Sequence, residues 1–351
     1  MATKPRSQII DPREPGIYHC WSRCVRRAFL CGVDKHSRKN YEHRRDWIEH
    51  RVEELARWFA IDIVFFAIMQ NHFHLVLRNL PQLVDRWSDK QVLERAIKIF
   101  PYKFKMLGVV DGKATRAQLR SFAKDAKLID QMRRRLSDPS WFLRQLKQYI
   151  ATRGNAEDEV TGHFFEGRFK CRAVTDEIGV LICGVYVDLN QIRAAEANSI
   201  ASSTRTSAYR RLRGVASRRN RRQGAVDLDG FLCPLNTRGD GQAGYPKAGG
   251  EGGRRASDKG VLEMSVEEYL KFLDWVGRQV QRGKRGKISD DTPAVLKQLG
   301  LTGAGFVTMI ENFEELFHTA VGTADSLAKL AAKTGQRWLR GVKAVALAQE
   351  G

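Results

Sequence analysis

The stretch NHFHLVLR, residues 71–78, carries two histidines separated by one residue. Side chains of a β-strand alternate between the two faces of its sheet, so His72 and His74 share one face while Phe73 takes the other. Their Cα atoms then stand roughly 7 Å apart, at about 3.3 Å of rise per residue, and the two imidazoles can converge on one metal ion. Two half-buried histidines that hydrogen-bond to their neighbours are the competing interpretation.

These histidines fall in the second of two predicted strands. In IDIVFFAIMQNHFHLVLR, β-branched and aromatic residues flank Gln70 and Asn71, a pattern typical of two strands joined by a tight turn. An earlier strand is expected at 16–25, and a helix at 41–60, where apolar residues recur at helical spacing. The end of 162–174 suits a further strand.

A second set of candidate residues lies on a helical pattern, DEIGVLICGVYVDLNQIRAA, at 176–195. Ile182, Tyr186 and Asn190 are spaced by four in this pattern and therefore stack on one face of the helix. The structural alternatives are that Tyr186 packs against a neighbouring element and that Asn190 ends its helix.

The order of these elements predicts an α+β fold of the ferredoxin-like type, in which helices cover a small antiparallel sheet. A helical insertion is expected over about 82–136, followed by a helix at 139–154 that proline opens and glycine closes. We divide the chain into a first domain at 1–196, a basic arm and flexible linker at 197–260, and a small helical C-terminal module at 261–351.

The chain is strongly basic. Its 351 residues include 60 Lys plus Arg against 40 Asp plus Glu, a formal net charge of +20. Such an excess favours a polyanionic partner because each neutralised phosphate releases condensed counterions. The sequence lacks a long basic amphipathic helix with a broad aromatic face, so nucleic acid is preferred to a membrane surface. The N-terminal residues lack the apolar core of a signal peptide, and the expected location is cytoplasmic.

Arginines dominate the segment 205–222, which has eight of them and no acidic residue. This segment is interpreted as an arm that contacts phosphates, with a solvated basic surface as the alternative. The six cysteines form no C-x-x-C pair, so reduced and partly buried thiols are expected. A zinc site is the alternative, built from Cys20, Cys24, Cys31, His19 and His36.

Four stretches occur in a characteristic order: SRCVRRAFLCG, NHFHLVLR, GHFFEGRFKCRAV and YVDLNQIRA. Together they resemble the single-tyrosine transposases of the HUH endonuclease superfamily, and the nearest group is the REP-associated tyrosine transposase-like proteins. The likeness covers about residues 15–196 and does not extend to the C-terminal module. This chain has Gln191 where the family usually has a proline, which concerns the local backbone and not the chemistry.

The resemblance implies a nuclease and strand transferase that acts on single-stranded DNA containing palindromic or hairpin repeats. His72 and His74 match the two histidine ligands of a divalent metal ion, Mg²⁺ or Mn²⁺, and Asn190 matches an additional ligand. Tyr186 matches the nucleophile, which forms a 5′-phosphotyrosine and frees a 3′-hydroxyl. The resemblance leaves open whether the protein is a monomer or a homodimer, and whether the tyrosine serves its own chain.

Elementary chemistry agrees with these roles, because phosphodiester transfer needs an in-line nucleophile and neutralisation of charge on the phosphate oxygens. A metal ion held by two imidazoles and an amide oxygen meets the second need, although imidazole also accepts zinc. Phosphate contacts or solvated charges are expected at the following residues: Arg23, Arg26, Arg27, Arg168, Lys170, Arg210, Arg211, Arg213, Arg218, Arg219, Arg221 and Arg222.

Three alternatives remain at this stage. One is a non-catalytic regulator that binds DNA or RNA on the same fold, although exposed stacking aromatics are sparse in the sequence. A second is a replication-initiating or conjugative nuclease of the same superfamily, which shares the chemistry. The third replaces Tyr186 by Tyr149 as nucleophile, but Arg153 and not an amide stands four residues after Tyr149.

Overall fold

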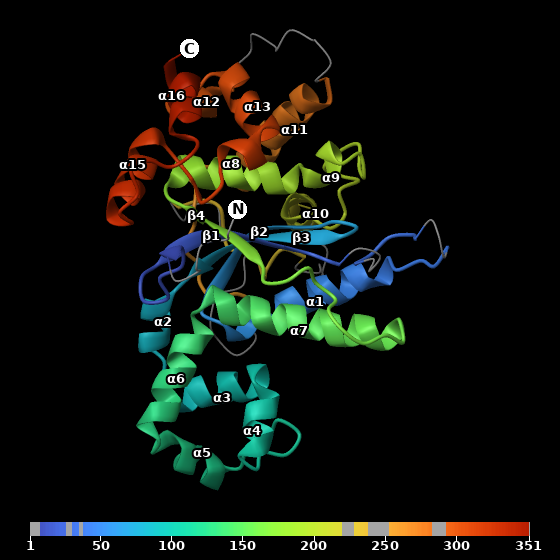
Figure 1. Ribbon diagram of the computed structural model, residues 1–351, viewed down its shortest axis with the longest axis vertical. Coiled ribbons are helices and arrows are strands. Elements are labelled where there is room, and N and C mark those ends of the chain that lie inside the picture. The colour runs from blue at the N-terminus through green and yellow to red at the C-terminus, as the bar shows by residue number, and fades with distance from the viewer. Residues whose placement is uncertain are drawn as a thin grey trace.

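One five-stranded mixed sheet lies at the centre of the fold, with helices on both of its faces (Figure 1). The α+β class is therefore confirmed. The strand order is β2-β3-β1-β4-β5, with β1 Gly16–Arg23, β2 Ile61–Ile68, β3 His72–Asn79, β4 Lys170–Val174 and β5 Ala320–Val321. The computed structural model describes residues 8–25, 30–34, 38–219, 228–237, 253–282 and 293–350.

The predicted hairpin is confirmed, since β2 and β3 pair antiparallel and flank the turn at Gln70 and Asn71. β1 lies between β3 and β4 and is antiparallel to both. The expectation of a wholly antiparallel sheet is wrong at one edge, because β5 pairs parallel to β4. β5 has two residues, too few for an alternating pattern, and it comes from the segment in which we expected helices alone.

Two long helices cover one face of the sheet, α1 (His43–Trp58) and α7 (Pro139–Glu157). Both pack on an apolar cluster that includes Phe66, Phe73 and Leu75. The prediction that glycine ends α7 is wrong, because the helix runs three residues past Gly154. Gly154 instead permits close packing, since a Cβ atom there would lie 2.5 Å from the ring of Phe164.

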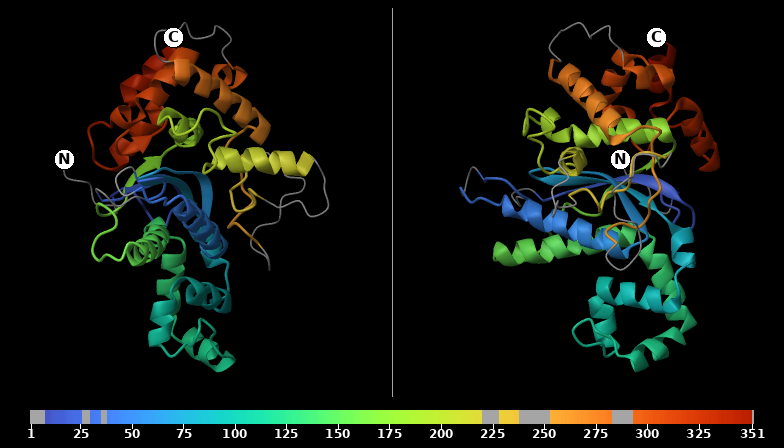
Figure 2. Two further views of the ribbon diagram at one scale, coloured as in Figure 1. Left: turned by 90° about the vertical axis from the view of Figure 1, so that its right-hand side faces the viewer. Right: turned by 180° about the vertical axis from the view of Figure 1, so that it is seen from behind.

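The stretch predicted to be a helical insertion forms a lobe of short helices beyond α1 and α7, on the side away from the C-terminal helices (Figure 2). Ser88 and Thr115 begin two of its helices with complete capping boxes, in which side chain and backbone bond reciprocally. The lobe consists of α2 Pro81–Asp85, α3 Asp89–Ile99, α4 Pro101–Met106, α5 Arg116–Ala123 and α6 Ala126–Leu136.

The opposite face of the sheet is covered by α8 (Glu177–Asp188), and the C-terminal helices lie over α8 in turn (Figure 1). The apolar side chains of α8 and of the C-terminal helices belong to one cluster, so α8 is buried on both sides. None of the described helices is long and apolar enough to cross a membrane. The remaining elements are α9 Asn190–Arg193, α10 Ser207–Arg219, α11 Val266–Arg282, α12 Ala294–Gln298, α13 Gly303–Glu311, α14 Phe313–Leu316, α15 Ala324–Lys333 and α16 Val342–Glu350.

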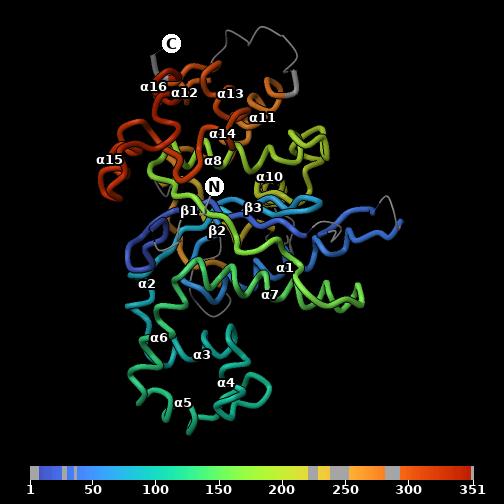
Figure 3. Tube along the Cα trace, in the orientation of Figure 1, coloured from blue at the N-terminus to red at the C-terminus, as the bar shows by residue number. Residues whose placement is uncertain are grey.

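The chain crosses between these layers several times, as its trace shows (Figure 3). Residues 320–321 return from the C-terminal helices to the sheet as β5, next to the start of α8. The approach is close, because a Cβ atom on Gly179 of α8 would lie 2.5 Å from the carbonyl oxygen of Val321. The division into three domains stays a prediction.

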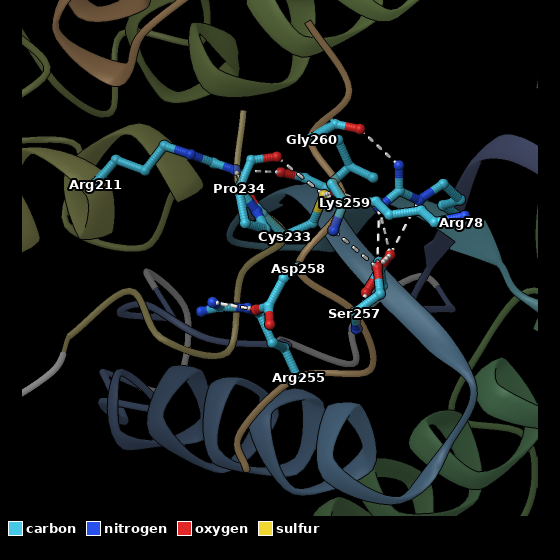
Figure 4. A network of polar contacts seen from close by, with 11 residues as sticks. Arg78, Arg211, Cys233, Pro234, Arg255, Ser257, Asp258, Lys259 and Gly260 are labelled. Atoms are coloured by element: carbon cyan, nitrogen blue, oxygen red, sulfur yellow. Dashed lines mark hydrogen bonds and ion pairs between the residues drawn. The ribbon is translucent and has the colours of Figure 1, made fainter. Parts of the chain in front are cut away.

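A polar network fixes part of the predicted flexible linker on the edge strand β2 (Figure 4). The buried carboxylate of Asp62 accepts hydrogen bonds from the Ser257 backbone N–H at 2.9 Å and from its hydroxyl at 2.7 Å. Arg78 of β3 donates to the same carboxylate and to the carbonyl oxygen of Gly260, at 2.8 Å. The linker interpretation is therefore wrong for these residues, and 238–252 lies outside the described residues.

We predict that Arg78→Ala lowers the free energy of unfolding by about 3 kcal/mol or more. The variant leaves the Asp62 carboxylate buried without its guanidinium partner, and an unpaired buried charge is costly. Urea denaturation of both proteins measures the difference.

The matched control is Arg134→Ala, which breaks the exposed ion pair with Asp130. We expect that control to change stability by less than about 1 kcal/mol. Equal losses in the two variants would show that the network at Asp62 does not hold the linker to the sheet.

Candidate functional site

The pairing of β1 with β3 assembles the base of the candidate site on the face covered by α8. His74 lies opposite Trp21, and His72 lies opposite Arg23 at the end of β1. His19, two residues before Trp21 on the same face, directs its ring at His74. His74 is 3% exposed, and His72, next to the turn, is partly exposed.

Hydrogen bonds determine which nitrogen of each imidazole carries the proton. Nδ1 of His72 lies 2.6 Å from Oδ1 of Asn71, an acceptor, so Nδ1 donates and Nε2 keeps its lone pair. Nε2 of His74 accepts from Nδ2 of Asn190 at 3.2 Å, so Nδ1 of His74 donates to Nε2 of His19 at 2.8 Å. Both predicted ligands therefore present Nε2 as the basic nitrogen.

Burial keeps both imidazoles neutral. Burial and, after it, the nearby Arg23 guanidinium lower the pKa of His72 to about 4. The pKa of His74 lies well below its usual value, chiefly because of burial and then because His19 lies beside it. Neutral imidazole is the form that binds metal ions.

Helix α8 places Tyr186 beside this pair. The centre of the Tyr186 ring lies 5.8 Å from that of His74, with the two planes at 86°. The helical turn that follows brings Nδ2 of Asn190 to 3.2 Å from Nε2 of His74. Four candidates from distant stretches, namely His72, His74, Tyr186 and Asn190, thus meet in one place.

Tyr186 is covered in this structure and is only 5% exposed. Its hydroxyl donates to Oε1 of Glu314 at 2.8 Å, and its ring stacks on Phe313 with centres 3.9 Å apart. Burial raises the pKa of the Tyr186 phenol above its usual range, and the negative charge of Glu314 raises it further. Arg193, 4.8 Å from the ring centre, acts in the opposite direction.

Four residues around this site were not predicted from the sequence to belong to it, although His19 was considered for a zinc site: His19, Phe313, Glu314 and Arg172, which pairs with Glu314. The alternation of side chains along β1 could have placed His19 at the site, because His19 shares a face of the strand with Trp21. The alternation also excludes His19 and Cys20 from one zinc site, since Cys20 faces Cys171 with their sulfur atoms 3.6 Å apart. His36, the other histidine of that alternative, lies outside the described residues.

A divalent ion is the group that the resemblance implies, and the side chains present offer it a small donor set. No three or more His, Cys, Asp or Glu side chains within the described ranges are grouped to hold a metal ion. His72 and His74 nevertheless present Nε2, and Asn190 supplies an amide group at His74. Two imidazoles and an amide oxygen would suit a metal site that keeps open positions for substrate, provided that the Asn190 amide turns its oxygen, in place of Nδ2, toward the ion.

The basic residues predicted to contact DNA divide into several groups. Arg23, Arg168 and Lys170 are exposed, and the register places Arg23 and Lys170 at the edge of the site, opposite His72 and Trp21. Arg26, Arg27, Arg221 and Arg222 lie outside the described residues.

The segment 205–222 is not an arm over its described part, because it forms α10 against the sheet. Arg211 is buried, and its guanidinium donates to two backbone carbonyl groups, so it is not presented to DNA. Arg210 and Arg218 form ion pairs with buried carboxylates. Arg213 and Arg219 are exposed on this helix.

Tyr149, the rival nucleophile, belongs to α7 on the other face of the sheet. Its hydroxyl accepts a hydrogen bond from Arg153 at 2.8 Å. It therefore lies apart from the histidines that would share its chemistry.

Comparison with known proteins gives one weak likeness. No family model matches the chain, and no curated protein matches it. A solved structure described as the REP-associated tyrosine transposase bound to a REP hairpin is similar over 65% of this chain and 90% of that chain, with 11% identity and a TM-score of 0.34. A TM-score of this size does not establish a common fold, so the assignment of function depends on the geometry of this chain.

The lowered pKa of His72 makes stability depend on pH. Its folded-state pKa of about 4 lies below the usual 6.5, so the unfolded chain takes up a proton first as the pH falls. This contribution to stability is complete above pH 6.5 and is lost as the pH falls toward 4. We predict that His72→Gln reduces the loss of stability between pH 7 and pH 5 by on the order of 2 kcal/mol.

Urea denaturation of parent and variant at both pH values measures this difference. The exposed His163 provides the control, because His163→Gln leaves the neutral imidazoles of the site in place. Identical pH dependence in the parent and His72→Gln would mean that His72 titrates normally.

Proposed function

We propose that this protein is a transposase-like endonuclease that cleaves hairpin-containing single-stranded DNA through Tyr186 and transfers the strand. The observation that carries the proposal is the convergence of Tyr186 with His72, His74 and Asn190, which come from β3, α8 and α9. A structural tyrosine needs no such neighbours, whereas phosphodiester transfer needs a nucleophile beside groups that neutralise charge.

In the proposed reaction, the Tyr186 oxygen attacks phosphorus in line with the leaving 3′ oxygen. The new bond joins the phenol oxygen to the 5′-phosphate, and the phosphorus–3′-oxygen bond breaks. The phenol proton is released and the departing oxygen becomes a 3′-hydroxyl, so protons balance. Attack by a 3′-hydroxyl on the phosphotyrosine reverses these bond changes and joins a strand, with no external energy source.

The other side chains bind and orient. His72, His74 and Asn190 would hold a divalent ion, Mn²⁺ or Mg²⁺, which when bound supplies Lewis-acid stabilisation of the phosphate charge. His19 accepts from Nδ1 of His74 and so keeps Nε2 unprotonated. Arg23, at the rim, offers a positive charge to the DNA backbone.

The arrangement of the sheet supports a ferredoxin-like interpretation of the first domain. Its four longer strands run in the order β2-β3-β1-β4 and are antiparallel to their neighbours. The helices that connect β1 to β2 and β3 to β4, α1 and α7, lie side by side on one face. Helix α8 then covers the opposite face with the proposed nucleophile.

A non-catalytic DNA-binding protein is the second candidate, and one observation favours it. The Tyr186 hydroxyl is nearly buried and already hydrogen-bonded to a carboxylate. Formation of a covalent protein–DNA adduct separates the two functions, because only the enzyme forms one.

We predict that Tyr186→Phe abolishes this adduct while the protein still binds single-stranded hairpin DNA. The variant loses one hydrogen bond, to Glu314, and should lose about 1 kcal/mol of stability. Denaturing gels of protein with 3′-labelled oligonucleotides measure the adduct, and Tyr149→Phe is the control that should retain it. A covalent band that persists in Tyr186→Phe would remove Tyr186 from the proposed chemistry.

We also predict that His72→Ala weakens binding of Mn²⁺ at least about tenfold, since one of two imidazole ligands is lost. Calorimetric titration of the folded protein with Mn²⁺ reports this without any reaction. His163→Ala, which removes an exposed histidine, is the control and should bind as the parent does. Equal affinity in all three proteins would refute the metal site.

A further inference from the structure

The carboxylate of Glu314 joins the proposed nucleophile to a buried arginine. Oε1 accepts from the Tyr186 hydroxyl at 2.8 Å, and Oε2 accepts from Nη2 of Arg172 at 2.9 Å. Glu314 belongs to α14, whereas Arg172 belongs to β4 and Tyr186 to α8. One anion therefore occupies the space between a nucleophilic oxygen and a guanidinium.

Arg172 has more hydrogen-bonding capacity than its surroundings use. Its side chain is 1% exposed, and its carbon Cζ lies 4.4 Å from the ring centre of Trp21 and 4.7 Å from that of Phe313. Nε and Nη1 are buried and have no hydrogen-bond partner among the described residues. Buried donors without partners are costly, and their usual explanation is a ligand or a functional role.

We propose that Arg172 binds the phosphate that Tyr186 attacks, and that the Glu314 carboxylate occupies the position of this phosphate in the structure. The inference rests on the proposed function. A planar guanidinium suits the oxygens of carboxylate and phosphate alike, and a phosphate has further oxygens for the two unused donors. The nucleophile must also lie beside the phosphorus, as the Tyr186 hydroxyl lies beside this carboxylate.

Access to this position requires that Glu314 leaves it. The Glu314 side chain is 50% exposed, so it can turn into solvent, whereas Phe313 is buried against Tyr186. A role for Glu314 as the base that takes the phenol proton is the competing interpretation. That role would keep a negative carboxylate against the phosphate, whose own charge opposes it.

The test compares Glu314→Gln with Glu315→Gln, which changes the neighbouring exposed glutamate. Calorimetric titration with inorganic phosphate is the first measurement. We expect Glu314→Gln to bind phosphate about tenfold more tightly than the parent, because the charged competitor is gone. Glu315→Gln should match the parent, and adding Arg172→Gln to Glu314→Gln should abolish the gain.

Adduct formation with hairpin DNA is the second measurement. We expect Glu314→Gln to form the adduct faster than Glu315→Gln does, whereas a base role for Glu314 predicts slower formation and would overturn the proposal. Phosphate binding that is no tighter in Glu314→Gln than in Glu315→Gln would also overturn it. Tighter phosphate binding without any adduct in any protein would instead refute the tyrosine chemistry and leave the phosphate site standing.

Thermal unfolding of each variant shows whether the buried arginine is needed for folding. If Arg172→Gln unfolds, Arg172→Lys keeps the charge but loses the planar fork of donors. In the Glu314→Gln background, Arg172→Lys should bind phosphate more weakly than Arg172 does. Equal phosphate affinity with arginine and lysine would count against a guanidinium site.

Discussion

The buried hydrogen bond between His19 and His74 joins the two central strands at the point on which the candidate site depends. It lies between β1 and β3, and both rings are nearly or wholly excluded from solvent. If Nδ1 of His74 did not donate to His19, Nε2 of His74 would carry the proton. It could then not accept the hydrogen bond from Asn190. The position of the Tyr186 helix over this face also depends on the pair, because the Tyr186 ring meets both imidazoles edge-on.

A second constraint is that the buried carboxylate at the end of α8 needs hydrogen-bond donors from other elements. Asp188, at its C-terminal end, is fully buried and accepts from Ser207 of α10 and from the Tyr269 hydroxyl of α11. These bonds supply donors to a buried carboxylate, and they also hold α10 and α11 against α8. The helix that carries Tyr186, the proposed nucleophile, is therefore fixed by elements far along the chain.

The sequence allowed prediction of features that depend on local periodicity. Alternation located β3 and placed His72 and His74 on one face, and the helical repeat placed Tyr186 and Asn190 one turn apart. Glu314 could not be predicted, because 128 residues separate it from Tyr186. Local sequence patterns do not indicate contacts between residues so far apart in the chain.

The arginine-rich segment was misinterpreted for a different physical reason. Charge alone does not distinguish an arginine that faces solvent from one whose guanidinium is used inside the fold. Arg211 donates to backbone carbonyl groups, and Arg218 pairs with the buried Asp229. These partners lie in β2 and in the loops that follow α10, so tertiary structure and not composition decides the role of each arginine.

The return of the chain to the sheet as β5 has a consequence for preparing the protein. A fragment ending at residue 196 would leave β4 with an unpaired edge and would uncover the apolar outer side of α8. Unpaired strand edges and large apolar patches promote aggregation. We therefore expect that a soluble fragment of this protein must include residues 320–321 and the helices around them.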